Sequence, residues 1–156
     1  MIDVVRIAAL IAVLSTGVVY GTDVFCALVQ RPALARVDDR ALTTVMGNVH
    51  RYGDRRMPIP GALGIIAAAI CAAVAGMAGR WAEAIPAAIA VGLLLAWIAL
   101  YRNVSAPINR QLAAAAQAGY VPSNVRVLQH NWDRIITARA VLQGLAVAAL
   151  CATLLI

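Results

Sequence analysis

Four long apolar runs divide the sequence, and each is close to the roughly 20 residues that an α-helix needs to cross a bilayer. Alanine, leucine and other small residues fill them, without the alternation that is typical of barrel strands. Because lipid offers no partner for an unpaired backbone group, such runs must be helical. They cover residues 7–29, 57–79, 84–101 and 140–156. We predict an all-α integral membrane four-helix bundle, one transmembrane domain over residues 1–156 with spans at about 5–29, 58–79, 83–103 and 133–155.

The connections between these runs are unequal. A short link around Arg80 joins the second run to the third, whereas the other two connections are long, so both lie at the same end of an up-and-down bundle. The first long connection predicts an amphipathic helix that starts at Pro32 and lies on the membrane surface. Its expected apolar face consists of Leu34, Val37, Ala41, Val45 and Val49. The second predicts a helix over residues 111–118 and a break at 119–122.

Composition and charge agree with a membrane protein. Hydrophobic residues make up 63% of the chain and charged residues 13%, too few to cover a soluble domain. The net charge of +6 comes from arginines, without a lysine, and most of them lie at the end with the long connections. By the positive-inside rule, we expect a multi-pass cell-membrane protein with these connections in the cytoplasm and both termini outside.

The charge and cysteine patterns exclude several classes of function. The arginines are not interleaved with aromatic residues, which argues against nucleic-acid binding. Cys26, Cys71 and Cys151 lie in apolar runs, so neither a disulfide framework nor a zinc site is predicted. The sequence contains no phosphate-loop, nucleophile-elbow, zincin or dinucleotide fingerprint. We therefore predict no cofactor, with a metal or haem as an open alternative.

Polar side chains form one stripe on the first helix and another on the fourth. The stripes consist of Thr16, Tyr20, Asp23 and Gln30, and of Trp132, Arg139 and Gln143. Both are costly against lipid, so we expect them to face the bundle interior, where Asp23 and Arg139 lie at similar depth and form a buried pair. Such a pair either fixes helix packing or handles a proton while the arginine steers an anionic or enolate oxygen.

The end of the third helix carries two amides, Asn103 and Asn109, around Pro107. The proline removes a backbone donor, so the helix is expected to kink or end there. Asn109 then either caps the next helix or donates a hydrogen bond to a ligand.

The two histidines have different prospects. His50 has Met46 one turn earlier and Asp54 one turn later, and a histidine beside a carboxylate is a common proton-transfer pair. Copper binding through His50 and Met46 is an alternative, although no repeated ligand spacing supports it. His130 lies nine residues before Arg139, on the opposite side of an unbroken helix, and is expected at the surface.

Taken in order, these features resemble the anthrone-oxygenase-like family of small four-helix membrane proteins. Its members have a glycine-containing first helix followed by a proline, a motif similar to Asn-Val-Pro-x-Asn after the third helix, and a Trp seven residues before an Arg in the fourth. The matching residues here are Gly17, Gly21, Pro32, the segment 103–109 (NVSAPIN), Trp132 and Arg139. The resemblance implies oxygenation of an electron-rich polycyclic phenol such as an anthrone, without a conventional cofactor. It implies Asp23 or His50 as the base, and Asn103, Asn109 and Arg139 as donors to an oxyanion.

The polar residues support three functional hypotheses. The leading one is a membrane protein that binds a hydrophobic small molecule in a polar-lined cavity at the loop end, as an anthrone-type oxygenase or another oxidoreductase. Its catalytic candidates are Asp23, His50 and Arg139, and its ligand-binding candidates are Tyr20, Asn103, Asn109, Trp132 and Gln143. The second is a non-catalytic membrane subunit or homo-oligomeric structural component. The third is haem or copper binding through His50, with Met46 as a further copper ligand and His130 available only if the fourth helix breaks.

Overall fold

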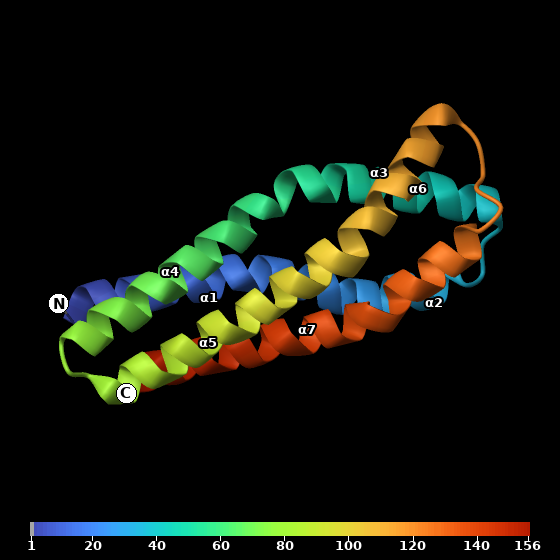
Figure 1. Ribbon diagram of the computed structural model, residues 1–156. Helices are drawn as coiled ribbons and strands as arrows, with labels where there is room; N and C mark the ends of the chain where they lie inside the picture. Colours follow the sequence, from blue (N-terminus) through green and yellow to red (C-terminus); the bar gives the residue numbers. More distant parts are fainter. Residues whose placement is uncertain (1) are drawn as a thin grey trace.

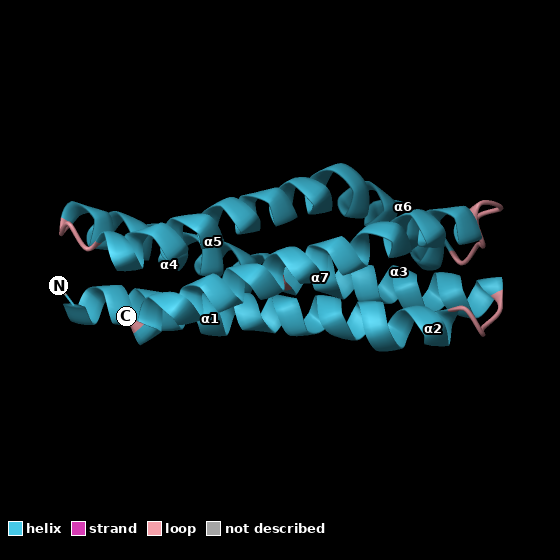
Figure 2. Ribbon diagram, turned by 90° about the horizontal axis from the view of Figure 1, so that it is seen from below, coloured by secondary structure: helices cyan, strands magenta, loops and turns pink. Residues whose placement is uncertain are grey.

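Helices account for nearly all of residues 2–156, which the computed structural model describes, with side chains described from Val4 onward (Figure 2). They are α1 (Ile2–Phe25), α2 (Arg31–Leu34), α3 (Asp39–Arg56), α4 (Pro58–Met77), α5 (Trp81–Leu100), α6 (Ala106–Ala118) and α7 (Val125–Leu155). One π-helical turn, Cys26–Gln30, joins α1 to α2, and a second, Tyr101–Ser105, joins α5 to α6. The predicted all-α fold is confirmed.

Four helical rods are long and apolar enough to cross a membrane. They are Val4–Leu34, Pro58–Met77, Trp81–Ala118 and Val125–Leu155. Figure 1 shows them side by side, with both termini at one end and α2, α3 and α6 at the other. This arrangement is the predicted membrane bundle with amphipathic helices on one side.

The bundle continues beyond its membrane-spanning part. The 20 residues of α4 match a hydrocarbon core of about 30 Å, at 1.5 Å per residue. The other three rods have 31, 38 and 31 residues, so they extend well past it. We call α2, α3, α6 and the first three turns of α7 the head. Its core joins Leu42 and Met46 of α3 to Leu112 of α6 and Ile136 of α7.

Two expectations for the first long connection are wrong. Pro32 lies in α2, which continues the first rod, and α3 begins only at Asp39. Asp38 caps α3 because its side chain accepts a hydrogen bond of 2.7 Å from the backbone N–H of Ala41. The expected apolar face is therefore not continuous: Leu34 lies in α2 and Val37 in the connection, whereas Val45 and Val49 lie in α3, where they are 45% and 41% exposed.

The face of α3 that is buried carries Leu42, Met46 and His50, and it packs against α6. Leu42, Met46 and His50 follow one another at four-residue spacing, and so do Ala41, Val45 and Val49. Periodicity alone therefore does not tell which of the two series is buried. Leu42 and Met46 belong to the same buried cluster as Leu112 of α6, whereas Val45 and Val49 are exposed and Val49 also borders a cavity.

Two rods continue through a proline, and the third rod changes direction where α5 passes into α6 (Figure 1). The backbone N–H of Ala106 bonds to the carbonyl of Tyr101, and that of Arg31 bonds to the carbonyl of Cys26. In each rod the next residue is a proline, Pro107 or Pro32, which has no N–H. The wider π-turn accommodates the missing donor, so the expected bend at Pro107 is confirmed as a kink in a continuous rod.

Small residues allow the membrane-spanning helices to pack closely. Ala9, Ala12, Ala68 and Ala90 are fully buried between the rods. In the head, Gly47 has the same role: a Cβ there would lie 2.3 Å from the Cβ of Ala116 on α6.

We predict that Gly47→Ala destabilises the head by roughly 1–3 kcal/mol, because α3 must move away from α6 to accommodate the new methyl group. The matched control is Gly53→Ala in the same helix, where a Cβ meets nothing within 4 Å. This control should be neutral or stabilising by up to about 1 kcal/mol. Thermal unfolding of the purified proteins measures both, and equal Tm values for the two variants would contradict the close packing.

Candidate functional site

A cavity of about 310 Å³ lies where the head joins the membrane-spanning bundle. Its apolar wall includes Val19, Val49 and Ile98, which come from α1, α3 and α5. Its polar lining includes Asp23, His50, Asp54, Asn109 and Arg139. The volume and the mostly apolar wall are those of a small-molecule site.

The cavity is level with the loop-side edge of α4. Gly64 packs against Thr16, since a Cβ on Gly64 would lie 2.6 Å from the Thr16 hydroxyl. Pro58 lies six residues before Gly64, and Asp23 lies seven residues after Thr16, each about 10 Å along its helix. Asp23 is therefore level with the first residue of the apolar α4.

Asp23 and Arg139 form the predicted buried pair, with 2.9 Å between the Arg139 Nη2 and an Asp23 carboxylate oxygen. Gln143 donates to the carboxylate at 2.6 Å, and the indole N–H of Trp97 lies at 3.4 Å. Arg139 also donates to the Ser105 hydroxyl at 2.8 Å. Residues of three rods thus hydrogen-bond to the two charges, as a pair removed from water requires, and only the Arg139 Nε has no partner among the described residues.

Asp54 is the centre of a second network. One of its carboxylate oxygens accepts hydrogen bonds of 2.8 Å from the Tyr101 hydroxyl and from the Asn109 amide. The Asn109 oxygen in turn accepts a 3.1 Å hydrogen bond from the Trp132 indole. The suggested capping role of Asn109 is wrong, because the rod continues through this position and its side chain instead connects α3, α6 and α7.

His50 lies between the two networks. It is 4% exposed, and its ring lies 5.3 Å from that of Trp132, centre to centre. Its Nε2 has no hydrogen-bond partner among the described residues, and its expected partner Asp54 bonds instead to Tyr101 and Asn109. Burial, together with the charge of Arg139, lowers the pKa of His50 to about 3. The imidazole is therefore neutral at physiological pH.

Three sequence candidates lie outside the cavity wall. Asn103 is exposed on the outer side, in a groove with Asn131 and Arg134. Tyr20 packs against Gly144, where a Cβ would meet its ring at 3.1 Å. Gln143 is buried behind Asp23.

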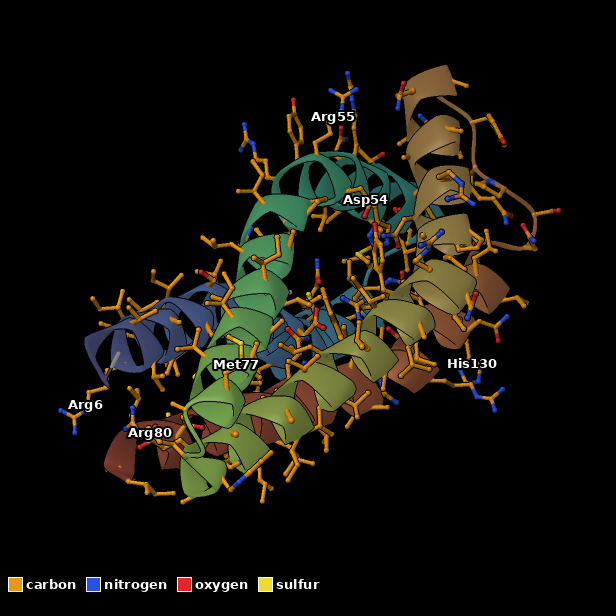
Figure 3. The ribbon with its side chains drawn as sticks, turned by 60° about the vertical axis from the view of Figure 1, so that its left-hand side comes forward. Arg6, Asp54, Arg55, Met77, Arg80 and His130 are labelled. Carbon is orange, nitrogen blue, oxygen red and sulfur yellow. The ribbon has the colours of Figure 1, made fainter. Side chains whose placement is uncertain are left out.

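His130 and the candidate copper ligand Met46 both lie away from the cavity. His130 lies on the outer surface of the head, as expected from its spacing (Figure 3). Met46 is fully buried in the head core between α3 and α6. Within residues 4–156 no group of three or more His, Cys, Asp or Glu side chains is arranged to hold a metal ion.

Sequence reasoning missed three site residues on the third rod: Trp97, Tyr101 and Ser105. Together with Asn109 they recur every four residues and face the interior of the bundle. Each neighbouring pair of this series shares one face of a helix, which is the signal that the sequence offered, but all four share a face only because of the π-turn at Tyr101–Ser105.

We predict that Asp23→Asn and Arg139→Gln each destabilise the protein by roughly 3–5 kcal/mol, because each leaves a buried charge without its partner. The double variant should lose clearly less stability than the sum of the two single losses, because neither charge remains buried in it. Thermal unfolding of the four proteins measures this coupling. Strictly additive losses would show that the two side chains do not interact.

We predict that His50 makes the protein less stable in mild acid. Its pKa in the folded protein, about 3, lies below the value of about 6.5 for a free histidine, so the unfolded chain takes up the proton first. The contribution of His50 to the free energy of unfolding is complete above pH 6.5. It falls as the pH drops and is smaller by roughly 2 kcal/mol at pH 5. Asp54 and Arg139 face the same space and also carry charge, so the test compares Tm at pH 7 and pH 5 for the wild type and His50→Gln. An equal drop in both would contradict the buried neutral state.

No protein-family model, curated protein or solved structure matches this chain. The chain is a small all-helical protein with four long apolar helices, and the resemblance to the anthrone-oxygenase-like family stays a prediction.

Proposed function

We propose that the protein binds a neutral hydrophobic small molecule carrying a hydroxyl or carbonyl group in the cavity between the bundle and the head. The observation that carries this proposal is the combination of a mostly apolar wall with buried polar atoms that lack partners. The Nε2 of His50 and the Nε of Arg139 have no hydrogen-bond partner among the described residues, and both side chains line the cavity. Buried polar groups of this kind favour a ligand that satisfies them.

The charges around the cavity support a neutral ligand. The positive charge of Arg139 is already balanced by Asp23. Asp54 adds a further carboxylate to the lining, and His50 carries no charge. The lining also includes Arg102, so its two acids and two arginines carry no net charge. A neutral hydroxyl or carbonyl therefore suits the site and needs only the free hydrogen-bonding positions.

The position of the cavity supports a hydrophobic ligand. It is level with the loop-side end of α4, and its exposed lining includes Pro58 and Ala62 of that apolar helix. A molecule dissolved in the bilayer would be concentrated at this depth. The two indoles in the wall, Trp97 and Trp132, add large apolar surfaces that favour such a ligand.

An oxygenase reaction of the anthrone type is the second candidate. In this reaction the substrate loses two hydrogens from one carbon and gains one oxygen atom from O₂, and the other oxygen atom leaves as water. His50 is the better candidate for the base, because Asp23 is already engaged by Arg139, Gln143 and Trp97. With a pKa of about 3, His50 is a weak base, so the transfer depends on the enolate remaining beside the new imidazolium. Arg139 and Asn109 are candidate donors to that enolate.

We predict that Gly53→Phe abolishes ligand binding because it fills the cavity. Gly53 lines the cavity, and a Cβ there meets nothing within 4 Å, so the ring enters open space. The matched control is Gly92→Phe on α5, also in a helix with open space at Cβ, but exposed and away from the cavity. Mass spectrometry of solvent extracts should find a lipophile in the wild type and Gly92→Phe, and at least tenfold less in Gly53→Phe.

The same three proteins, together with His50→Gln, distinguish the remaining functions. Oxygen uptake with anthrone as the probe, present in the wild type and lost in Gly53→Phe and His50→Gln, would support the oxygenase. Bound lipophile without oxygen uptake would leave a binding protein. A stoichiometric partner chain with no lipophile in any sample would contradict the proposal and favour a structural membrane subunit.

A further inference from the structure

A cluster of basic side chains covers the outer side of the bend between α3 and α4. We call Arg51, Tyr52, Arg55 and Arg56 the elbow cluster. Arg55 and Arg56 are exposed, and Figure 3 shows Arg55 pointing away from the bundle. The guanidinium groups of Arg51 and Arg56 lie 5.9 and 5.3 Å from the centre of the Tyr52 ring, which holds them on one side of the helix.

The charge of the elbow cluster is not balanced by the protein. Among the described side chains, the ion pairs involve Arg80, Arg126 and Arg139, and none involves an arginine of this cluster. Asp54 is the acid within the same segment, but it turns inward, where it bonds to Tyr101 and Asn109 (Figure 3). The exposed charges of Arg55 and Arg56 therefore have no carboxylate partner, and the partly buried Arg51 adds a third positive charge beside them.

An apolar stripe begins directly below these charges. Ile59, Leu63, Ile66 and Ile70 follow at alternating spacings of four and three residues along α4, and all four are exposed, Ile59 at 73%. Arg56 lies two residues before Pro58, at the loop-side end of that apolar helix. The arginines thus lie at headgroup depth, and the stripe lies at the depth of the acyl chains.

We propose that the elbow cluster binds the phosphate of an anionic phospholipid from the loop-side leaflet, with the acyl chains of that lipid along the α4 stripe. The unbalanced guanidinium groups complement a headgroup with net negative charge, and arginine donates two hydrogen bonds to one phosphate. A zwitterionic headgroup offers the same phosphate but no net charge. This site faces away from the cavity and does not depend on the function proposed for it.

The test counts lipids bound to the full-length protein by native mass spectrometry. Detergent-solubilised protein is titrated with phosphatidylglycerol or with phosphatidylcholine of the same acyl chains. Basic residues near an anionic leaflet each contribute about fivefold in affinity, so Arg55→Gln/Arg56→Gln should bind phosphatidylglycerol about 30-fold more weakly. Binding of phosphatidylcholine should change less than twofold.

The matched control is Arg36→Gln/Arg40→Gln, which removes the same charge from exposed positions. Arg40 lies 15 residues before Arg55, about 22 Å along α3 and beyond the reach of screened charge at 0.1 M salt. This control should retain phosphatidylglycerol binding within twofold. Arg55→Lys/Arg56→Lys keeps the charge but loses the paired hydrogen bonds, so its affinity should lie between those of the wild type and Arg55→Gln/Arg56→Gln.

Three results would overturn the proposal. They are equal wild-type affinities for the two lipids, an equal loss in the Arg36/Arg40 control, and displacement of bound lipid by soluble glycerol phosphate at millimolar concentration. The last would show a site for free phosphate. If Arg55→Gln/Arg56→Gln does not fold, the wild type decides: raising the salt from 50 to 500 mM should remove its preference for phosphatidylglycerol, and an unchanged preference would refute the electrostatic basis.

Discussion

The loop-side half of this protein depends on the burial of one ion pair, Asp23 with Arg139. Neither charge is tolerated alone in apolar surroundings, and a buried pair is stabilised by further hydrogen bonds to its members. Gln143 of α7 and Trp97 and Ser105 of the third rod supply these hydrogen bonds, and the Arg139 Nε is left for a ligand. These contacts fix the axial register of α1, α5 and α7 at the level where α4 begins, and so they determine where the cavity lies.

The π-turn in the third rod makes those contacts geometrically consistent. In a regular α-helix, residues four apart drift by about 40° per step, so a stripe from Trp97 to Asn109 would rotate away from the interior by about 120°. The wider turn at Tyr101–Ser105 rotates the following residues back. Trp97, Ser105 and Asn109 therefore all reach interior partners. Pro107, which lacks an N–H, stabilises this irregular turn relative to a straight helix.

The sequence predicted the features that depend on hydrophobicity and on the cost of burying charge. Run lengths indicated the four rods, and the polar stripes indicated that Asp23 meets Arg139. Features that depend on side-chain size or on a tertiary partner were not predictable in the same way. The face of α3 that packs against α6 was not predicted, because two apolar series share one spacing. Asn103 was grouped with Asn109 although six residues and a π-turn separate their faces. The partners of Asp54 come from α6 and the π-turn, and no local pattern near residue 54 reveals them.

The last two turns of α3 connect the interior of the site to its exterior. His50 and Asp54 lie one turn apart and line the cavity, whereas Arg51 and Arg55 follow each of them by one residue, about 100° around the helix. The inward pair is held by Tyr101, Asn109 and the Trp132 ring, so this segment cannot rotate without breaking buried hydrogen bonds. The outward arginines are consequently fixed in direction by interactions that lie on the other side of the helix. A headgroup on the outer surface and a ligand in the cavity would therefore contact opposite sides of the same rigid segment of α3. A shift of this segment would affect both contacts.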